Sequence, residues 1–276
     1  MKAVPTSKSN TGKYIPAKDA NTDDDVLWLK SNSEPWQEVI EKWQKTFPFR
    51  QNQTQGTVQE YLDKWEILKN CKGHTLINFD FEKLYMEKSL NFYKHWNTFF
   101  DKLFEFKKAQ VTNEYALNLI DTLNGLVEND KKLPTQISLL AYLIPPKGRL
   151  SRKIKFSASE ATEGLIVQTH NAGDIEQAIN KQKEKAASRH QTVQPFVLLQ
   201  GNLQDFSALY IVIDDIKYQL QSATKAFDLL FKSYHVLNAK YPDSAEYLYL
   251  IIQRKVYGIT TRYDKIPPHI VEILNL

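Results

Sequence analysis

The fold class is decided by residues 208–220, which read ALYIVIDDIKYQL. Two runs of β-branched, aromatic and aliphatic residues flank the pair Asp214-Asp215, and this pattern predicts two strands joined by a tight turn. Leu165–His170 and Val193–Gln200 have the same β-rich character, so they predict further strands of the same sheet. Because hairpin strands run in opposite directions, we expect a mainly antiparallel sheet.

Helices are predicted on both sides of these strands. One follows Leu165–His170 with Asp174 as its cap, and two follow the hairpin, capped by Ser222 and Ser244. The order of elements after residue 160 is therefore β-α-β-β-β-α-α. This order is typical of an α+β unit in which helices pack on a sheet.

The stretch ahead of the strands, residues 33–146, has helical periodicity. Its apolar residues recur at three- and four-residue spacing, most clearly over Ser89–Phe106. Thr57 and Glu60 match a capping box at the start of another helix. The pattern predicts five helices in this region, with a short extended piece at His74–Phe81.

Composition and charge divide the chain into four parts. Residues 1–32 are predicted to form a flexible arm, because they bury too little apolar surface to offset the entropy of ordering. Residues 33–146 are the helical region, residues 147–159 a basic linker, and residues 160–276 the α+β domain. The expectation is a predominantly helical α+β protein in which a helical layer precedes the domain that contains the strands.

Most signatures of catalysis and cofactor binding are missing from the sequence. It has no phosphate-binding glycine loop, only nine glycines, and six histidines without metal-ligand spacing. The single cysteine, Cys71, excludes a disulfide framework and is predicted to be a buried, inert thiol. We therefore expect no cofactor and no metal.

No membrane association is expected. The sequence has no apolar run near the ~20 residues of a membrane-spanning helix. Residues 1–30 also lack the apolar core of a secretion signal. The predicted location is nuclear or cytoplasmic.

One constellation supports an enzymatic alternative. Asp205, Asp215 and Lys217 lie around the predicted hairpin, and Asp215-Ile216-Lys217 is similar to the acid-x-Lys step of metal-dependent nucleases. Two carboxylates could hold a divalent ion, and the lysine could steady an attacking hydroxide. The competing interpretation is that Asp215 is a turn residue and Lys217 a solvent-facing strand residue.

A basic stretch is the second candidate site. Within nine residues the chain carries five cations and no acid, namely Lys147, Arg149, Arg152, Lys153 and Lys155. Such a patch could contact nucleic-acid phosphates or act as a nuclear-targeting signal. A solvated loop without a ligand is the alternative.

The second half of the chain carries a resemblance in seven short stretches, namely 193–197, 210–218, 235–238, 241–242, 252–253, Tyr257 and 263–265. These stretches resemble a group of uncharacterised proteins scattered through insect and other animal genomes, often in a mobile-element-like setting. The similarity covers mainly residues 160–276, with fainter echoes near Trp65–Phe81. The group has no assigned activity, so the resemblance implies a shared domain and favours a link to nucleic acid or chromatin. Its members commonly have Gly at the position of Asp215, so the resemblance makes a catalytic role for this carboxylate doubtful.

The interpretation favoured by the sequence is a non-enzymatic binding or scaffold protein. Its partner would be another protein or a second copy of the chain, with nucleic acid or chromatin as a further partner through the basic stretch. Aromatic side chains are favoured at interaction hot spots, so Trp28 and Trp36 are the predicted partner-binding residues. The metal-dependent nuclease built on Asp205, Asp215 and Lys217 remains the alternative.

Overall fold

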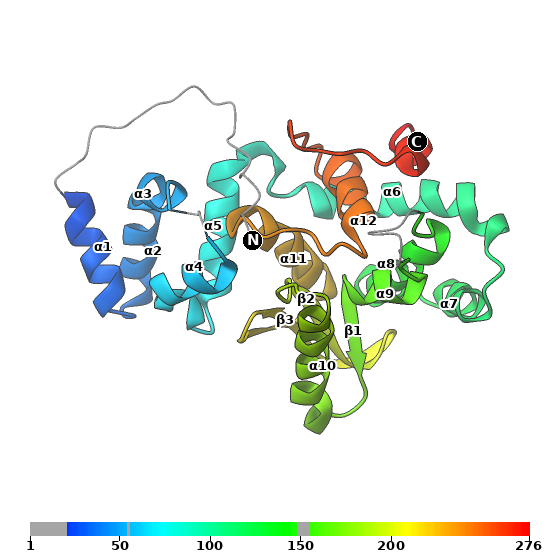
Figure 1. Cartoon of the computed structure of the whole chain (residues 1–276), viewed down its shortest axis with the longest axis horizontal. Helices are drawn as coiled ribbons and strands as arrows, with labels where there is room; N and C mark the ends of the chain where they lie inside the picture. Colours follow the sequence, from blue (N-terminus) through cyan, green and yellow to red (C-terminus); the bar gives the residue numbers. More distant parts are fainter. Residues whose placement is uncertain (1–20, 54–55, 148–154) are drawn as a thin grey trace.

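A computed structural model describes residues 21–53, 56–147 and 155–276 of the chain (Figure 1). Helices dominate its first half: α1 Asn21–Ser31, α2 Trp36–Lys45, α3 Phe47–Gln51, α4 Val58–Lys64, α5 Gly73–Leu84, α6 Asn91–Lys107, α7 Glu114–Asn124 and α8 Asn129–Leu143. The second half contains α9 Ala158–Glu163, β1 Ile166–Thr169, α10 Ile175–Ser188, β2 Phe196–Asn202, β3 Asp205–Ile213, β4 Ile216–Leu220, α11 Ala223–Val236, α12 Glu246–Ile251 and α13 Val271–Leu274. The predicted class, a predominantly helical α+β fold, is confirmed.

Within the described residues, four strands form one mixed sheet in the order β1-β2-β3-β4. The pairs β2–β3 and β3–β4 are antiparallel, as the hairpin pattern predicts, and Ile213 faces Ile216 across the turn. Asp214 adopts a φ of 54° there, a conformation that Asp tolerates in tight turns. The pair β1–β2 is parallel, because helix α10 carries the chain across the sheet between these two strands.

Both faces of the sheet are covered. Successive strand residues point to opposite faces, and the core clusters follow this alternation. Leu198 and Val212 pack with Ile179 of α10 on one face, whereas Leu199 and Ile211 join the main core on the other. Figure 1 shows α10 lying against the sheet and α11 passing above it at the centre of the molecule.

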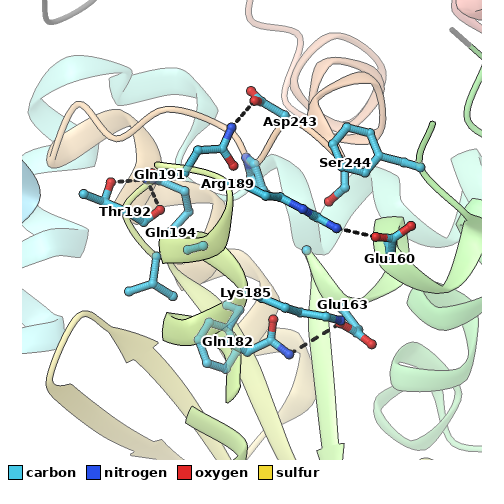
Figure 2. A pocket seen from close by; sticks show the side chains of 16 residues that line it. Glu160, Glu163, Gln182, Lys185, Arg189, Gln191, Thr192, Gln194, Asp243 and Ser244 are labelled. Carbon is cyan, nitrogen blue, oxygen red and sulfur yellow. Dashed lines mark hydrogen bonds and ion pairs between the residues drawn. The ribbon is translucent and has the colours of Figure 1, made fainter. Parts of the chain in front are cut away.

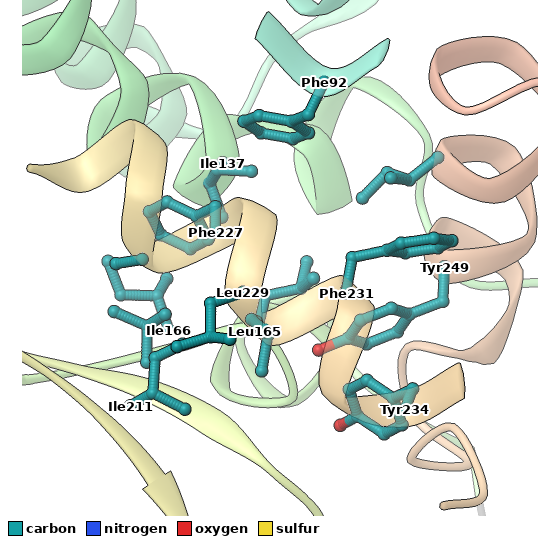
Figure 3. Close-up of a cluster of buried hydrophobic side chains, with 14 of the residues drawn as sticks. Phe92, Ile137, Leu165, Ile166, Ile211, Phe227, Leu229, Phe231, Tyr234 and Tyr249 are labelled. Atoms are coloured by element: carbon teal, nitrogen blue, oxygen red, sulfur yellow. The ribbon is translucent and has the colours of Figure 1, made fainter. Parts of the chain in front are cut away.

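Helix α11 packs against helices of the first half of the chain and against the sheet. It contacts α5, α6 and α8 as well as strands β2, β3 and β4. Most of the residues of α11 are therefore buried, from Ala226 to Tyr234 without a break, although Lys225 near its start is exposed. Figure 3 shows the cluster, in which Phe227, Leu229 and Phe231 of α11 lie between Phe92 of α6 and Ile211 of β3.

The polar groups of α11 are satisfied inside the protein. Asp228 and Lys232, whose side chains are 5% and 6% exposed, form an ion pair of 2.6 Å. The second carboxylate oxygen of Asp228 accepts a hydrogen bond from the Tyr257 hydroxyl at 2.7 Å. The Tyr234 hydroxyl donates to the Pro195 carbonyl oxygen at 2.5 Å, which ties α11 to the start of β2. Buried polar groups without such partners would destabilise the helix.

The N-terminus of α11 is capped by a residue of α8. The Asp130 carboxylate accepts hydrogen bonds from the Thr224 and Ala223 amides at 2.8 and 3.0 Å, and from the Ser222 hydroxyl at 2.7 Å. Although burial acts in the opposite direction, these bonds hold the pKa of Asp130 below its ordinary value. A carboxylate at a helix N-terminus also meets the positive end of the helix dipole.

A buried ion pair fixes the orientation of α5. The Arg50 guanidinium, 1% exposed, forms a two-pronged pair with Asp80 of α5, and its second nitrogen also donates to the Trp43 carbonyl oxygen at 2.6 Å. The guanidinium carbon lies 3.4 Å from the centroid of the Trp43 ring, an arrangement that favours a cation. The residues that α5 presents to α11 are held in place by this anchor.

The structure corrects two predictions about the first half. His74–Phe81 is helical rather than extended, because Ile77 and Phe81 are buried at helical spacing in the main core. The predicted arm at residues 1–32 is helical over Asn21–Ser31, where Val26 and Leu29 are buried in the same core. The rest of that arm, residues 1–20, lies outside the described residues.

Replacement of Asp130 by Ala should destabilise the protein by about 1–2 kcal/mol, because the Ala223 and Thr224 amides lose their acceptor even though the N-cap residue Ser222 remains. The measurement is the free energy of unfolding in urea. Asp121→Ala, which removes an exposed acid from α7, is the control and should change stability little. Equal effects of the two substitutions would contradict the role given to Asp130.

Candidate functional site

The three residues of the nuclease alternative are not brought together. Asp205 is the first residue of β3, whereas Asp215 follows its last residue, so the two carboxylates lie at opposite ends of the strand. Asp215 pairs with Lys183 and Lys217 pairs with Glu176, both on α10. These pairs hold the hairpin against α10. Among the described residues, no group of three or more His, Cys, Asp or Glu side chains could hold a metal ion.

The other predicted site residues are only partly described. Lys147 and Lys155 are exposed, while Arg149, Arg152 and Lys153 lie outside the described residues. Trp28 and Trp36, predicted to be exposed for a partner, are half-buried and pack against the main core. The ammonium groups of Lys42 and Lys72 lie 5.2 and 5.8 Å from the Trp28 and Trp36 ring centroids. Cys71, predicted to be buried, is exposed.

One cleft lies between α9, the end of α10 and the segment 242–244 (Figure 2). Its charged side chains pair with one another across the opening: Arg189 with Glu160, Lys185 with Glu163, and the Gln191 amide with Asp243. The space inside is about 90 Å³. A ligand would have to break these pairs to gain contacts, so the cleft holds α9 and α10 together rather than offering a free site.

A second cleft, which we call the α11 cleft, lies between α5, α6, the end of β4 and α11. Its volume is about 270 Å³, close to the lower limit of small-ligand pockets. The lining residues are His74, Asn78, Leu90, Tyr93, Leu220, Lys225, Asp228, Leu229 and Lys232. The four residues from α11 follow a spacing of three, one and three positions, so they share one face of the helix.

Polar groups with unused hydrogen-bonding capacity face the α11 cleft. The side-chain oxygen of Asn78 is buried and has no partner within the described residues. Lys232 donates to Asp228 at 2.6 Å, although an ammonium group has three donors. Lys225 is exposed, and its ammonium group has no acceptor in the described part of the chain. Burial and the nearby charge of Lys225 lower the pKa of His74, which favours a neutral ring.

The rim of the α11 cleft is apolar and open to solvent. Leu90 is 56% exposed and Tyr93 is 46% exposed, although both also line the cleft. Burial of part of the phenol, with the charges of Asp228 and Asp130 nearby, raises the pKa of Tyr93 to about 12. The hydroxyl therefore stays protonated and can donate a hydrogen bond. Large apolar side chains beside spare polar groups are typical of a binding surface.

A partly buried chain of polar side chains lies at the C-terminal end of α5. His235 lies between the Tyr85 and Tyr241 hydroxyls at 3.3 and 3.1 Å, and the Tyr241 hydroxyl donates to Gln253 at 3.0 Å. A π-helical turn, Ile252–Val256, places Gln253 where its amide also donates to Asp264 at 3.0 Å. These groups satisfy one another, so we assign them a structural role.

Comparison of the chain with protein-family models, with curated proteins and with solved structures finds no match. The resemblance of residues 160–276 to mobile-element-like proteins therefore stays a prediction. No helix in the described part of the chain has both the length and the apolar character that crossing a membrane requires.

The sequence does not single out the residues of the α11 cleft. His74, Tyr93 and Lys232 come from three helices that are far apart in the chain, and they match no known motif. The available signal is the row Lys225, Asp228, Leu229 and Lys232, which places three charges on a helix face opposite apolar residues. A charged helix face is ordinarily solvated, so the row alone does not predict a cleft.

Stability should fall as the pH falls from about 6.5 to 4. Burial lowers the pKa of His235 to about 4, despite the opposing charge of Asp264, whereas an unfolded histidine has a pKa of about 6.5. Below pH 6.5 the unfolded chain therefore binds a proton that the folded protein does not, and at pH 4 this costs roughly 3 kcal/mol. The measurement is urea unfolding at several pH values.

His235→Gln should remove most of this pH dependence, because the replacement does not titrate. The exposed His95→Gln serves as the matched control and should keep the wild-type profile. A wild-type slope in the His235→Gln protein would contradict the assignment.

Proposed function

We propose that the protein is a non-enzymatic binding protein that takes a segment of a partner protein into the α11 cleft. The observation that carries this proposal is the combination of exposed Leu90 and Tyr93 with buried polar groups whose hydrogen-bonding capacity is unused. A partner side chain entering the cleft would lie against apolar walls and reach Asn78 and Lys232 at its base. Its flanking residues would cover the rim.

The energetics favour this use of the surface. Burying an aromatic and an aliphatic side chain together removes apolar area from water and is worth about 1.5–3 kcal/mol for each fully buried residue. An aromatic side chain at the edge of a pocket is also the residue type that most often dominates an interface. Tyr93 has this position, with one part of its ring against the cleft and the rest in solvent.

The support for binding rather than catalysis comes from how the charged groups are used. Asp215, Lys217, Glu160 and Arg189 all engage in ion pairs that join one element to another. Asp228 has both carboxylate oxygens occupied, by Lys232 and Tyr257. These carboxylates are engaged in contacts that stabilise the fold. The α11 cleft, in contrast, presents mainly hydrogen-bond donors and an apolar surface.

Tyr93→Ala should weaken partner binding about tenfold or more, as expected for a hot-spot aromatic. The assay selects peptides from a random displayed library on the immobilised full chain and measures the affinity of the synthesised winners in solution. Tyr115→Ala is the matched control, because Tyr115 of α7 has nearly the same exposure, 47%, and does not line the cleft.

Three results would contradict the proposed function. The first is a selection that yields no peptide, and the second is a set of peptides that tolerate Tyr93→Ala as well as Tyr115→Ala. The third is binding of duplex DNA with an affinity that falls steeply with salt and with replacement of Lys147 and Lys155, which would identify the basic stretch as the functional site. Sedimentation of the wild type and of Tyr93→Ala would show whether a second copy of the chain is the partner.

A further inference from the structure

We infer that the segment recognised by the α11 cleft is acidic, and that a carboxylate side chain of the partner binds between Lys225 and Lys232 while an adjacent apolar side chain packs on Leu90 and Tyr93. This inference rests on the proposed function and specifies the chemistry of the partner. Its basis is the unequal supply of donors and acceptors in the cleft.

The cleft contains one unpaired acceptor, the Asn78 side-chain oxygen, and its unused donors outnumber it. Lys225 has no acceptor within the described residues, and Lys232 has one, the Asp228 carboxylate. The Tyr93 hydroxyl adds a further donor. The one acid, Asp228, already accepts from Lys232 and from Tyr257, so it does not attract a cation. An anionic acceptor is the group that this set would bind most strongly, since hydrogen bonds to ionised groups are about twice as strong as neutral ones.

The positions of the two lysines on one face of α11 allow a carboxylate to lie between them. They are seven residues apart on α11, which places their backbones about 10 Å apart along the helix axis. Both side chains line the same cleft, and long lysine side chains can converge on a group between them. Lys232 is 5% exposed, so a carboxylate that reaches it is shielded from water. Shielding strengthens the attraction between opposite charges.

The apolar rim indicates a peptide rather than a free small acid. Leu90 and Tyr93 are 56% and 46% exposed, and the cleft that they line has a volume of about 270 Å³. A small acid inside the cleft would leave these side chains in water. A peptide with an aliphatic residue next to its Glu or Asp covers both the lysines and the rim, which matches charge and apolar surface at once.

The experiment uses two synthetic peptide libraries that differ at one fixed position. Both contain a central Leu and otherwise random residues. One has Glu and the other Gln two positions before that Leu. We expect the full chain to retain the Glu library about tenfold better at low salt, and we expect the preference to shrink as salt is raised. Free glutarate should not displace the retained peptides at millimolar concentration.

Variants assign the preference to the cleft. Lys225→Ala should abolish most of it without unfolding the protein, because Lys225 is exposed. Asn78→Asp, which adds a negative charge at the base of the cleft, should reverse it. The control is Lys181→Ala, which removes an exposed lysine from α10 on the other face of the sheet and should leave the preference unchanged. Lys232→Met is avoided, because it would leave Asp228 buried without its partner and destabilise the fold.

The outcomes separate the inference from the proposed function. Equal retention of both libraries, lost on Tyr93→Ala, would overturn the acidic partner and leave the binding cleft in place. Retention of the Glu library that is equally sensitive to Lys181→Ala would place the charge preference elsewhere and also overturn the inference. Displacement by glutarate would show that the cleft binds a small acid rather than a peptide, which would overturn the inference. No retention of either library would overturn both.

Discussion

The near-complete burial of α11 is the constraint from which most of the structure follows. Apart from the exposed Lys225 near its start, this helix needs partners on most of its surface, and α5, α6, α8 and the sheet supply them. It also has to satisfy its own charges internally, which is why Asp228 and Lys232 pair at one helical turn of separation. Removing one member of such a pair would leave a buried charge without compensation, at a cost of about 3–5 kcal/mol.

The same constraint creates the α11 cleft. Residues of α5, α6 and α11 line a space of about 270 Å³, and Leu90 and Tyr93 in its lining remain partly exposed. The buried ion pair with Asp228 fixes the position of the Lys232 side chain in the lining of the cleft. The remaining N–H donors of its ammonium group are therefore held in place by the protein and not by solvent. A binding group fixed in this way loses little side-chain entropy when a ligand arrives. The cleft is therefore preorganised by the packing that stabilises the fold.

Sequence reasoning succeeded where the signal is local. The hairpin around Asp214 and the capping box at Thr57 both depend on neighbouring residues, and both are present. It failed for α5, because the β-branched Thr75 and Ile77 favour a strand locally and the packing of α5 on α2 and α11 outweighs that preference. The parallel pairing of β1 and the assembly of the α11 cleft depend on contacts between distant segments, which no short pattern encodes.

The shared core has a consequence for how the chain matures during synthesis. The helices of the first half bury their apolar faces against α11, yet α11 ends at Val236, 93 residues after α8 ends at Leu143. At translation rates of about 5–20 residues per second, these faces remain without their partner for roughly 5–20 s. Nascent chains in that interval expose apolar surface. Chaperones that recognise apolar segments should therefore bind this protein often during synthesis. A late frameshift would then lead to aggregation rather than to a stable fragment.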